Sequence, residues 1–134
     1  MSTIQDCNLL NIPKIEDPRG NLSVIENNVI PFEIKRVYYL YDVPSGAQRG
    51  GHSHIEQQEF LVALSGSFDV ILNDGKQEKK VSLNKPFEGL LITNRIWREL
   101  KNFSSGAVCL VIASDVFSEE DYIREFPDFL ESKL

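Results

Sequence analysis

The sequence predicts an all-β fold, a sandwich or barrel of short strands joined by tight turns. Short apolar or alternating runs recur along the whole chain, as expected for strands. Proline and glycine interrupt these runs at frequent, regular intervals. Asn73-Asp74-Gly75 separates two of the runs and favours a type I′ hairpin turn, which needs positive φ at its centre. Many short strands separated by turns are typical of sandwiches and barrels.

The runs between these interruptions predict the individual strands. An apolar strand is expected near the N-terminus, over residues 9–12, and the histidine segment before residue 55 is expected to be extended. The other predicted strands cover residues 22–26, 34–43, 60–64, 68–72, 79–83, 90–93, 96–100 and 107–113.

A short C-terminal helix is the only helix that the sequence predicts. Ser118 can cap it, and the acidic residues 119–121 place negative charge on its first turn. Pro127 is expected to stop or redirect the helix. Apolar residues 122, 123 and 126 fall at helical spacing and predict a stripe that packs on the barrel or on a second subunit.

Length and charge limit the classes of function. The 134 residues suffice for one domain spanning 1–134, and no repeat or linker divides them. No apolar run reaches about 18 residues, and residues 1–10 lack a basic segment, so neither a membrane span nor a secretory signal is expected. A net charge of −6 argues against nucleic acid or anionic membranes as partners. Cys7 and Cys109 lie in apolar surroundings and are interpreted as buried reduced thiols of a cytoplasmic protein.

The chain has only two histidines, and they stand one residue apart in the pattern Gly46-x5-His52-x-His54-x4-Glu59-x6-Gly66. Side chains alternate along a strand, so His52 and His54 are expected on one face, roughly 7 Å apart. Two imidazoles directed into one space suit either a metal site or proton transfer.

This spacing resembles the first sequence motif of the cupin superfamily. A longer resemblance, over nearly the whole chain, is to the nucleotide-sugar 3,4-ketoisomerases, similar to enzymes that act on dTDP-4-keto-6-deoxyglucose. It implies a single-domain cupin, a jelly-roll β-barrel, that isomerises a dTDP-linked keto sugar in deoxysugar and polysaccharide biosynthesis. The resembling segments are residues 17–22, 36–42, 49–54, 64–67, 97–103 and 121–124.

A cupin metal usually has a fourth ligand, a histidine placed four residues before an asparagine. Here Arg98 stands in that position before Asn102, and a guanidinium has no lone pair to offer a metal. His52, His54 and Glu59 could still form a two-histidine, one-carboxylate iron site. We expect no metal and no other cofactor, because a permanent cation would repel a divalent ion.

The resemblance places catalysis on the histidine pair, with His52 as the base and His54 as a shuttle or hydrogen-bonding partner. It also implies that one tyrosine of the strand over 34–43 faces the sugar. If Val37 and Val43 mark the core side, Tyr39 and Tyr41 point inward, and we predict Tyr39 as a catalytic and Tyr41 as a substrate-binding residue.

A diphosphate ligand of an acidic protein must be met by particular arginines. Arg19, in a Pro-Arg-Gly turn, and Arg49, three residues before His52, are the leading candidates; the others are Arg36, Arg95 and Arg98. Trp97 is expected either to stack on a base or sugar or to pack in the core or an interface. Arg98 is also placed in the substrate site, where Glu59 would orient a histidine or tyrosine.

The leading interpretation is a metal-independent sugar 3,4-ketoisomerase that works through an enediol and gives the 3-keto sugar. The alternatives are a metal-dependent, dioxygenase-like cupin, a nucleotide-sugar 3,5-epimerase and a non-catalytic sugar-binding cupin. A homodimer is expected, with residues 9–12 as the shared edge strand, because a small barrel leaves sheet edges that need covering.

Overall fold

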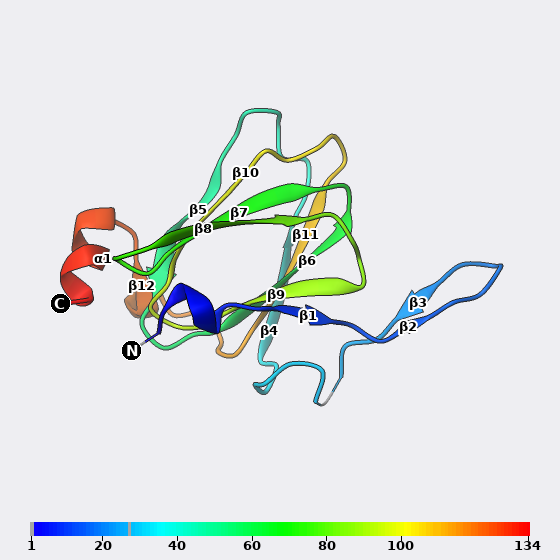
Figure 1. Ribbon diagram of the computed structural model, residues 1–134, viewed down its shortest axis with the longest axis horizontal. Helices are drawn as coiled ribbons and strands as arrows, with labels where there is room; N and C mark the ends of the chain where they lie inside the picture. The colour runs from blue at the N-terminus through cyan, green and yellow to red at the C-terminus, as the bar shows by residue number, and fades with distance from the viewer. Residues whose placement is uncertain (1, 27) are drawn as a thin grey trace.

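Two five-stranded antiparallel sheets face each other in the computed structural model, which describes residues 2–26 and 28–134 (Figure 1). The prediction of an all-β fold of two packed sheets with a short C-terminal helix is confirmed. One sheet contains, in spatial order, β1 (Leu9–Asn11), β9 (Glu88–Ile92), β6 (Glu59–Ser65), β11 (Val108–Ala113) and β4 (Arg36–Leu40). The other contains β12 (Tyr122–Ile123), β5 (Arg49–His54), β10 (Trp97–Lys101), β7 (Phe68–Asn73) and β8 (Glu78–Leu83).

The main hydrophobic core lies between the two sheets and follows the alternation of strand side chains. On β7, Phe68, Val70 and Leu72 are buried and the residues between them are partly exposed. Strand β6 differs because both of its faces are covered: Leu61 belongs to the core between the sheets, whereas Phe60 packs in a second cluster on the outer face. A strand buried on both faces reads as a continuous apolar run, which is how β6 appears in the sequence.

A small hairpin, β2 (Lys14–Ile15) and β3 (Leu22–Ser23), stands away from the sandwich (Figure 1). Strand β3 is shorter than the strand predicted over 22–26, because its hydrogen-bonded ladder ends at Ser23. The strand predicted over 34–43 is likewise reduced to β4, Arg36–Leu40.

The turn between β7 and β8 occurs where the sequence predicts a hairpin, but it is wider than a type I′ turn. Asn73 pairs with Glu78, so residues 74–77 form the loop. Gly75 has positive φ whereas Asp74 does not. Oδ1 of Asp74 instead accepts the backbone N–H groups of residues 76 and 77, at 2.9 and 2.8 Å, and this Asx-type bonding favours the longer loop.

The C-terminal helix begins where the sequence predicted that it would end. Residues 119–121 form a single 3₁₀ turn, η2 (Glu119–Asp121), and the next two residues form β12 on the edge of β5. Helix α1 (Phe126–Ser132) follows, with Pro127 in its first turn. Proline is suited to that position because its fixed φ is helical and its missing N–H would have no partner there.

A further 3₁₀ turn, η1 (Ile4–Asp6), precedes β1. Among the described residues, no helix is long and apolar enough to cross a membrane.

Both cysteines are buried and free, as predicted. Burial, and next the charge of Glu59, raise the pKa of the Cys109 thiol to about 12. The thiolate form is the reactive one, so Cys109 is an inert packing residue.

Candidate active site

A bulge in β5 positions the first histidine. His52 pairs with Arg98 of β10, and the register then shifts by one residue before the next pair. Gly50 and Gly51 provide the extra residue, with φ of +94° and +40°, a region that favours glycine. The bulge turns the carbonyl of Gly50 back onto the His52 ring, and Nδ1 of His52 donates a hydrogen bond to it.

His52 and His54 point to the same side of β5, as predicted, into the space between the sheets. Their Nε2 atoms lie 3.2 Å apart, and their rings meet edge to face with centroids separated by 4.8 Å. His52 lines a cavity, whereas His54 is fully buried behind it. Only His52 of the two can therefore touch a ligand in that cavity.

Strand β12 brings an acidic residue to the second histidine. Tyr122 pairs with His54 across the strands, which places the Asp121 carboxylate 3.1 Å from Nδ1 of His54. The same carboxylate accepts the backbone N–H groups of residues 56 and 57, at 2.7 and 3.2 Å. The sequence predicted Asp121 only as a charge on a helix turn, so this contact was missed.

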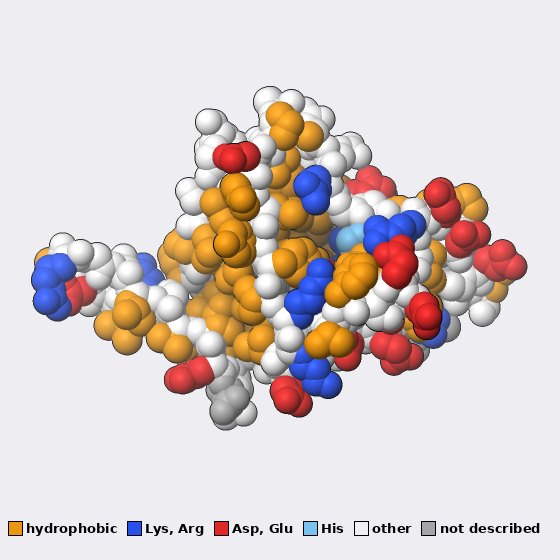
Figure 2. All heavy atoms as spheres, turned by 180° about the vertical axis from the view of Figure 1, so that it is seen from behind, with side chains coloured by type: hydrophobic (Ala, Val, Ile, Leu, Met, Phe, Trp, Pro, Cys, Tyr) orange, Lys and Arg blue, Asp and Glu red, His pale blue; other side chains and the backbone are white. Residues whose placement is uncertain are grey.

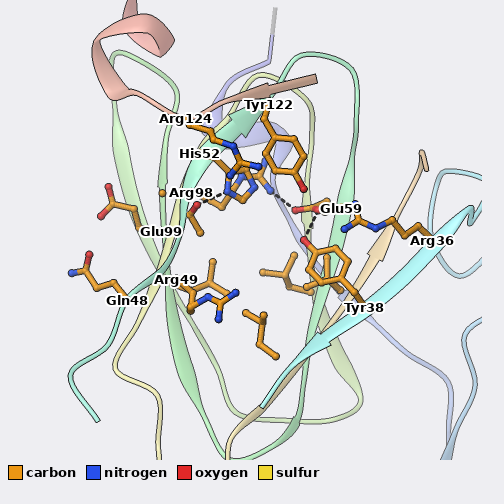
Figure 3. Close-up of a pocket in the computed structure, with 16 residues that line it drawn as sticks. Arg36, Tyr38, Gln48, Arg49, His52, Glu59, Arg98, Glu99, Tyr122 and Arg124 are labelled. Atoms are coloured by element: carbon orange, nitrogen blue, oxygen red, sulfur yellow. Dashed lines mark hydrogen bonds and ion pairs between the residues drawn. The ribbon is translucent and has the colours of Figure 1, made fainter. Parts of the chain in front are cut away.

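Glu59 is the centre of a second network, which lies next to the histidine pair (Figure 3). Its Oε1 accepts a hydrogen bond from Nη1 of Arg98 at 2.6 Å. Its Oε2 accepts hydrogen bonds from the hydroxyl of Tyr38 at 2.8 Å and from Nε2 of Gln57 at 2.9 Å. Glu59 thus orients a tyrosine, which is one of the two roles that the sequence suggested.

The donor set of this site does not fit a divalent cation. Ligand atoms of His52, His54 and Glu59 lie within 4.8 Å of one another, as a metal site would require. Both carboxylate oxygens of Glu59, however, are already bound by hydrogen-bond donors, one of them the guanidinium of Arg98. A permanent cation therefore occupies the side of the site where a fourth ligand would stand.

Burial, and next the charge of Arg98, lower the pKa of His52 to about 3 and that of His54 to about 2. Both imidazoles are therefore neutral at pH 7 and carry a free lone pair. Burial, and next the charge of Glu59, raise the pKa of Tyr38 well above its usual range, so its hydroxyl stays protonated. The site thus combines neutral bases with a neutral donor.

The cavity has a volume of about 680 Å³ and is lined by Arg36, Arg49, Arg98 and Arg124 (Figure 3). The guanidinium of Arg36 lies over the Tyr38 ring, 4.5 Å from its centroid, and its Nη1 is buried with no partner among the described residues. Arg124 lies 4.2 Å from the centroid of the Tyr122 ring. Arg98 and Arg124 are paired with Glu59 and Glu119. Arg36 and Arg49 are therefore the cations that suit an anionic ligand, although the whole chain is acidic.

The prediction that Tyr39 and Tyr41 point inward is wrong. Their side chains lie on the outer face of the first sheet, 60% and 61% exposed, and Tyr38 points into the cavity instead. The prediction took Val37 as a core residue, but Val37 is 54% exposed. Because β4 carries apolar side chains on both faces, its alternation did not reveal which face is inward.

Two other predicted residues lie outside the cavity. Trp97 is buried beneath α1, where its ring packs against Phe126 and Phe129 and its Nε1 donates to Glu99, so the packing alternative is confirmed. Arg19 lies at the tip of the β2–β3 hairpin with its side chain 89% exposed and paired with Asp17. The hairpin projects away from the sandwich, so Arg19 does not reach the cavity of its own chain (Figure 1).

Sequence reasoning placed several residues correctly and missed others. Arg49, His52, Glu59 and Arg98 all line the cavity. Arg36, named among the further phosphate candidates, also lines the cavity, whereas Tyr38, Tyr122 and Arg124 were missed although their segments carried the family resemblance. Tyr38 and Tyr122 each stand two residues from an arginine in an extended segment, which puts both side chains on one side, a pattern that could have marked them.

Comparison with known proteins gives a family match along most of the chain. The family model described as "FdtA: WxcM-like, C-terminal" matches residues 5–134. The curated TDP-4-oxo-6-deoxy-alpha-D-glucose-3,4-oxoisomerase of Aneurinibacillus thermoaerophilus is 44% identical over 122 residues, which cover 90% of this chain and 88% of that protein.

Solved structures give the same result. A 3,4-ketoisomerase from Helicobacter canadensis is 45% identical, with a TM-score of 0.93 over 96% of this chain and 97% of its own. A histidine-to-asparagine mutant of the 3,4-ketoisomerase QdtA from Thermoanaerobacterium thermosaccharolyticum, in complex with TDP-4-keto-6-deoxyglucose, is 38% identical. Its TM-score is 0.93 over 95% of this chain and 93% of its own.

Proposed function

Because this chain belongs to the FdtA family (WxcM-like, C-terminal), we propose that it is a sugar 3,4-ketoisomerase whose substrate is a TDP-linked 4-keto-6-deoxyhexose. The relatives named above are isomerases of this kind, and one of them binds TDP-4-keto-6-deoxyglucose. The product is the corresponding 3-keto sugar. The observation that carries the proposal is a pair of contacting, neutral imidazoles, one of which lines an arginine-bearing cavity.

The chemistry needs a base, a way to move a proton between two oxygens, and stabilisation of an anion. The C4 ketone acidifies the hydrogen on C3. A base removes that proton, and the C–H electron pair forms an enediolate whose charge lies on O4. The O3 proton then moves to O4 and a proton is returned to C4, leaving a ketone at C3. General-base catalysis and stabilisation of the oxyanion are the two main contributions.

Each of these tasks has a candidate in the cavity. His52 is the proton carrier, because it lines the cavity while His54 lies behind it. The Tyr38 hydroxyl, which donates its single hydrogen to Glu59, replaces Tyr39 as the tyrosine that faces the sugar, and its lone pairs can accept a hydrogen bond from a sugar hydroxyl. Arg49 and Arg36, which line the same cavity, are suited to the diphosphate.

Proton NMR of the purified protein with TDP-4-keto-6-deoxyglucose tests this function. A 3,4-ketoisomerase converts the C4 ketone to a C3 ketone and leaves the configuration at C5 unchanged. A 3,5-epimerase instead inverts C3 and C5 and keeps the C4 ketone, and a sugar-binding cupin leaves the compound unchanged. Appearance of the 3-keto sugar is the expected result, and either of the other outcomes would replace the proposal.

We also propose a homodimer of this one-domain chain. The outer face of the first sheet exposes Val37, Tyr39 and Leu64 beside an apolar groove, and Figure 2 shows the broad hydrophobic area on this side of the molecule. The β2–β3 hairpin adds Ile15 and Leu22, which are 60% and 52% exposed. An exposed apolar area of this size favours a protein partner. A second copy of the chain carries the same apolar surface, so two copies can cover each other about a two-fold axis.

The edge strand β1, predicted as the shared edge, leads directly into this hairpin. In such a dimer Arg19 could serve only the cavity of the other copy, because it does not reach its own. Sedimentation should give a mass twice the 15.3 kDa of one chain. A monomer at micromolar concentration would contradict the proposed dimer. The cytoplasm remains the proposed compartment, supported by the two buried free thiols.

A further inference from the structure

The four ring nitrogens of the histidine pair have strongly unequal surroundings. Nδ1 of His52 faces the Gly50 carbonyl, and Nδ1 of His54 faces the Asp121 carboxylate. The two Nε2 atoms face each other across 3.2 Å. We propose that Asp121 is a positioning residue that holds His54 in its Nδ1–H tautomer, so that the two Nε2 lone pairs converge and take up the sugar proton as one base.

Asp121 can act on His54 only as a hydrogen-bond acceptor. Its Oδ1 and Oδ2 receive backbone N–H groups from residues 56 and 57, at 2.7 and 3.2 Å. Both oxygens therefore act as acceptors in these contacts. Because Oδ2 accepts in this way, Nδ1 of His54 carries the hydrogen of their 3.1 Å contact.

The Gly50 carbonyl imposes the same state on the other ring. A carbonyl oxygen only accepts, so Nδ1 of His52 must donate. A neutral imidazole has a single N–H, and both rings have placed theirs on Nδ1. Each Nε2 is therefore left with a lone pair, and the short distance between them leaves room for one shared proton.

This arrangement gives the fully buried His54 a part in the reaction without touching the sugar. On the proposed function, from which this inference proceeds, the C3 proton moves to Nε2 of His52 while the C–H electron pair enters the enediolate. The proton is then shared with Nε2 of His54 and is returned to C4. Oε2 of Glu59, 3.7 Å from Nε2 of His54, stabilises the positive charge while the pair holds the proton.

Asp121→Asn separates the positioning role from a structural one. Its amide oxygen would keep the shorter, 2.7 Å backbone hydrogen bond of Oδ1 and give up the longer, 3.2 Å bond of Oδ2, which turns the NH₂ group toward His54. That group can only donate, so it would force Nδ1 of His54 to accept and move the His54 hydrogen to Nε2. This hydrogen would then be donated to Nε2 of His52, whose lone pair would no longer be free to take up the sugar proton. A wrong histidine tautomer of this kind costs about 10⁴-fold in kcat in serine proteases.

The chain suits a direct measurement because it has only two histidines. Protein labelled with ¹⁵N in histidine, and prepared without a histidine tag, gives four ring-nitrogen signals. At pH 7.5 the wild type should show two neutral rings, each protonated on Nδ1. In Asp121→Asn one ring should change to the Nε2–H form, with kcat lowered at least about a hundredfold and KM nearly unchanged.

Glu120→Gln is the matched control, because it removes the neighbouring exposed charge and should leave spectrum and turnover unchanged. A wild-type ring protonated on Nε2, or an unchanged His54 tautomer in Asp121→Asn, would overturn the inference. The wild-type spectrum alone shows whether both rings are protonated on Nδ1, so it tests the inference even if the variant does not fold. Absence of ketoisomerase turnover with the expected spectrum would instead overturn the proposed function.

Discussion

Arg98 and Glu59 form an ion pair across the two sheets, with Nη1 of Arg98 2.6 Å from Oε1 of Glu59 and the side chains 1% and 2% exposed. Arg98 also donates from Nε and Nη2 to the carbonyl of residue 96. A buried charge is tolerated when it is paired and hydrogen-bonded in this way. The pair gives a cupin barrel a fixed cation in place of a metal ligand, beside two neutral histidines.

Turnover should therefore not depend on a metal. Dialysis against EDTA should leave kcat unchanged, and elemental analysis of protein purified without chelator should find far less than one metal ion per chain. The reason is that Glu59 is held by Arg98 and cannot complete a ligand set. Loss of turnover in EDTA with recovery in Fe, Mn or Zn would reassign His52, His54 and Glu59 as ligands.

Tyr38→Phe should lower kcat roughly tenfold to a hundredfold, because it removes the hydroxyl that accepts from and orients a sugar hydroxyl beside His52. Tyr39→Phe, the next residue on β4, makes the same change on the outer face and should leave kcat unchanged. Steady-state kinetics of the two variants checks this. Equal losses in both, or a loss confined to Tyr39→Phe, would contradict the placement of Tyr38 in the reaction.

The buried histidines should make the protein less stable in acid. Their folded pKa values, about 3 and about 2, lie below the unfolded value of about 6.5. Between these limits the unfolded chain binds more protons, so stability is full above pH 6.5 and falls as the pH drops toward 3. Each histidine contributes a slope of about 1.4 kcal/mol per pH unit.

Urea unfolding at pH 7 and pH 5 measures this effect. His54→Asn should show a smaller loss of stability between the two pH values than the wild type. If the two proteins lose the same stability, or if the wild type is more stable at pH 5, the histidines are not buried as neutral groups.

Arg49→Ala should raise KM about tenfold or more while leaving kcat nearly unchanged, because a charge-assisted contact to the diphosphate is lost and the proton chemistry is not. Arg95→Asn is the comparison: Arg95 lies outside this cavity, and its φ of 60° suits asparagine. A fall in kcat for Arg49→Ala at saturating substrate would place Arg49 in the reaction instead.

The strand pattern and the histidine motif were readable from the sequence because each depends on local alternation. His52 and His54 share a face since they are two residues apart. The place of Arg98, opposite His52 on a neighbouring strand, was indicated only by the resemblance to the cupin motif. The direction in which β4 faces was not readable. Val37 and Tyr39 on one side are as apolar as Tyr38 and Leu40 on the other, and only the tertiary packing separates them.

The contacts of residues 119–124 also required the structure. Three consecutive acidic residues after Ser118 favour a helix start by local rules, yet η2 ends after one turn and β12 joins the edge of β5. The strand pairing and the Asp121–His54 contact stabilise this segment through long-range interactions, since 67 positions separate Asp121 from His54. Local propensity cannot report an interaction at that separation.

Solvent deuterium incorporation tests the central claim most directly. With TDP-4-keto-6-deoxyglucose in deuterated buffer, proton NMR should show that the wild type isomerises the sugar and introduces deuterium at C3 or C4. His52→Asn keeps a similar polar shape but removes the base, and it should slow this incorporation at least about a hundredfold while nucleotide binding hardly changes. His54→Asn should also slow it. If both variants incorporate deuterium at the wild-type rate, neither histidine carries the proton and the proposed mechanism is wrong.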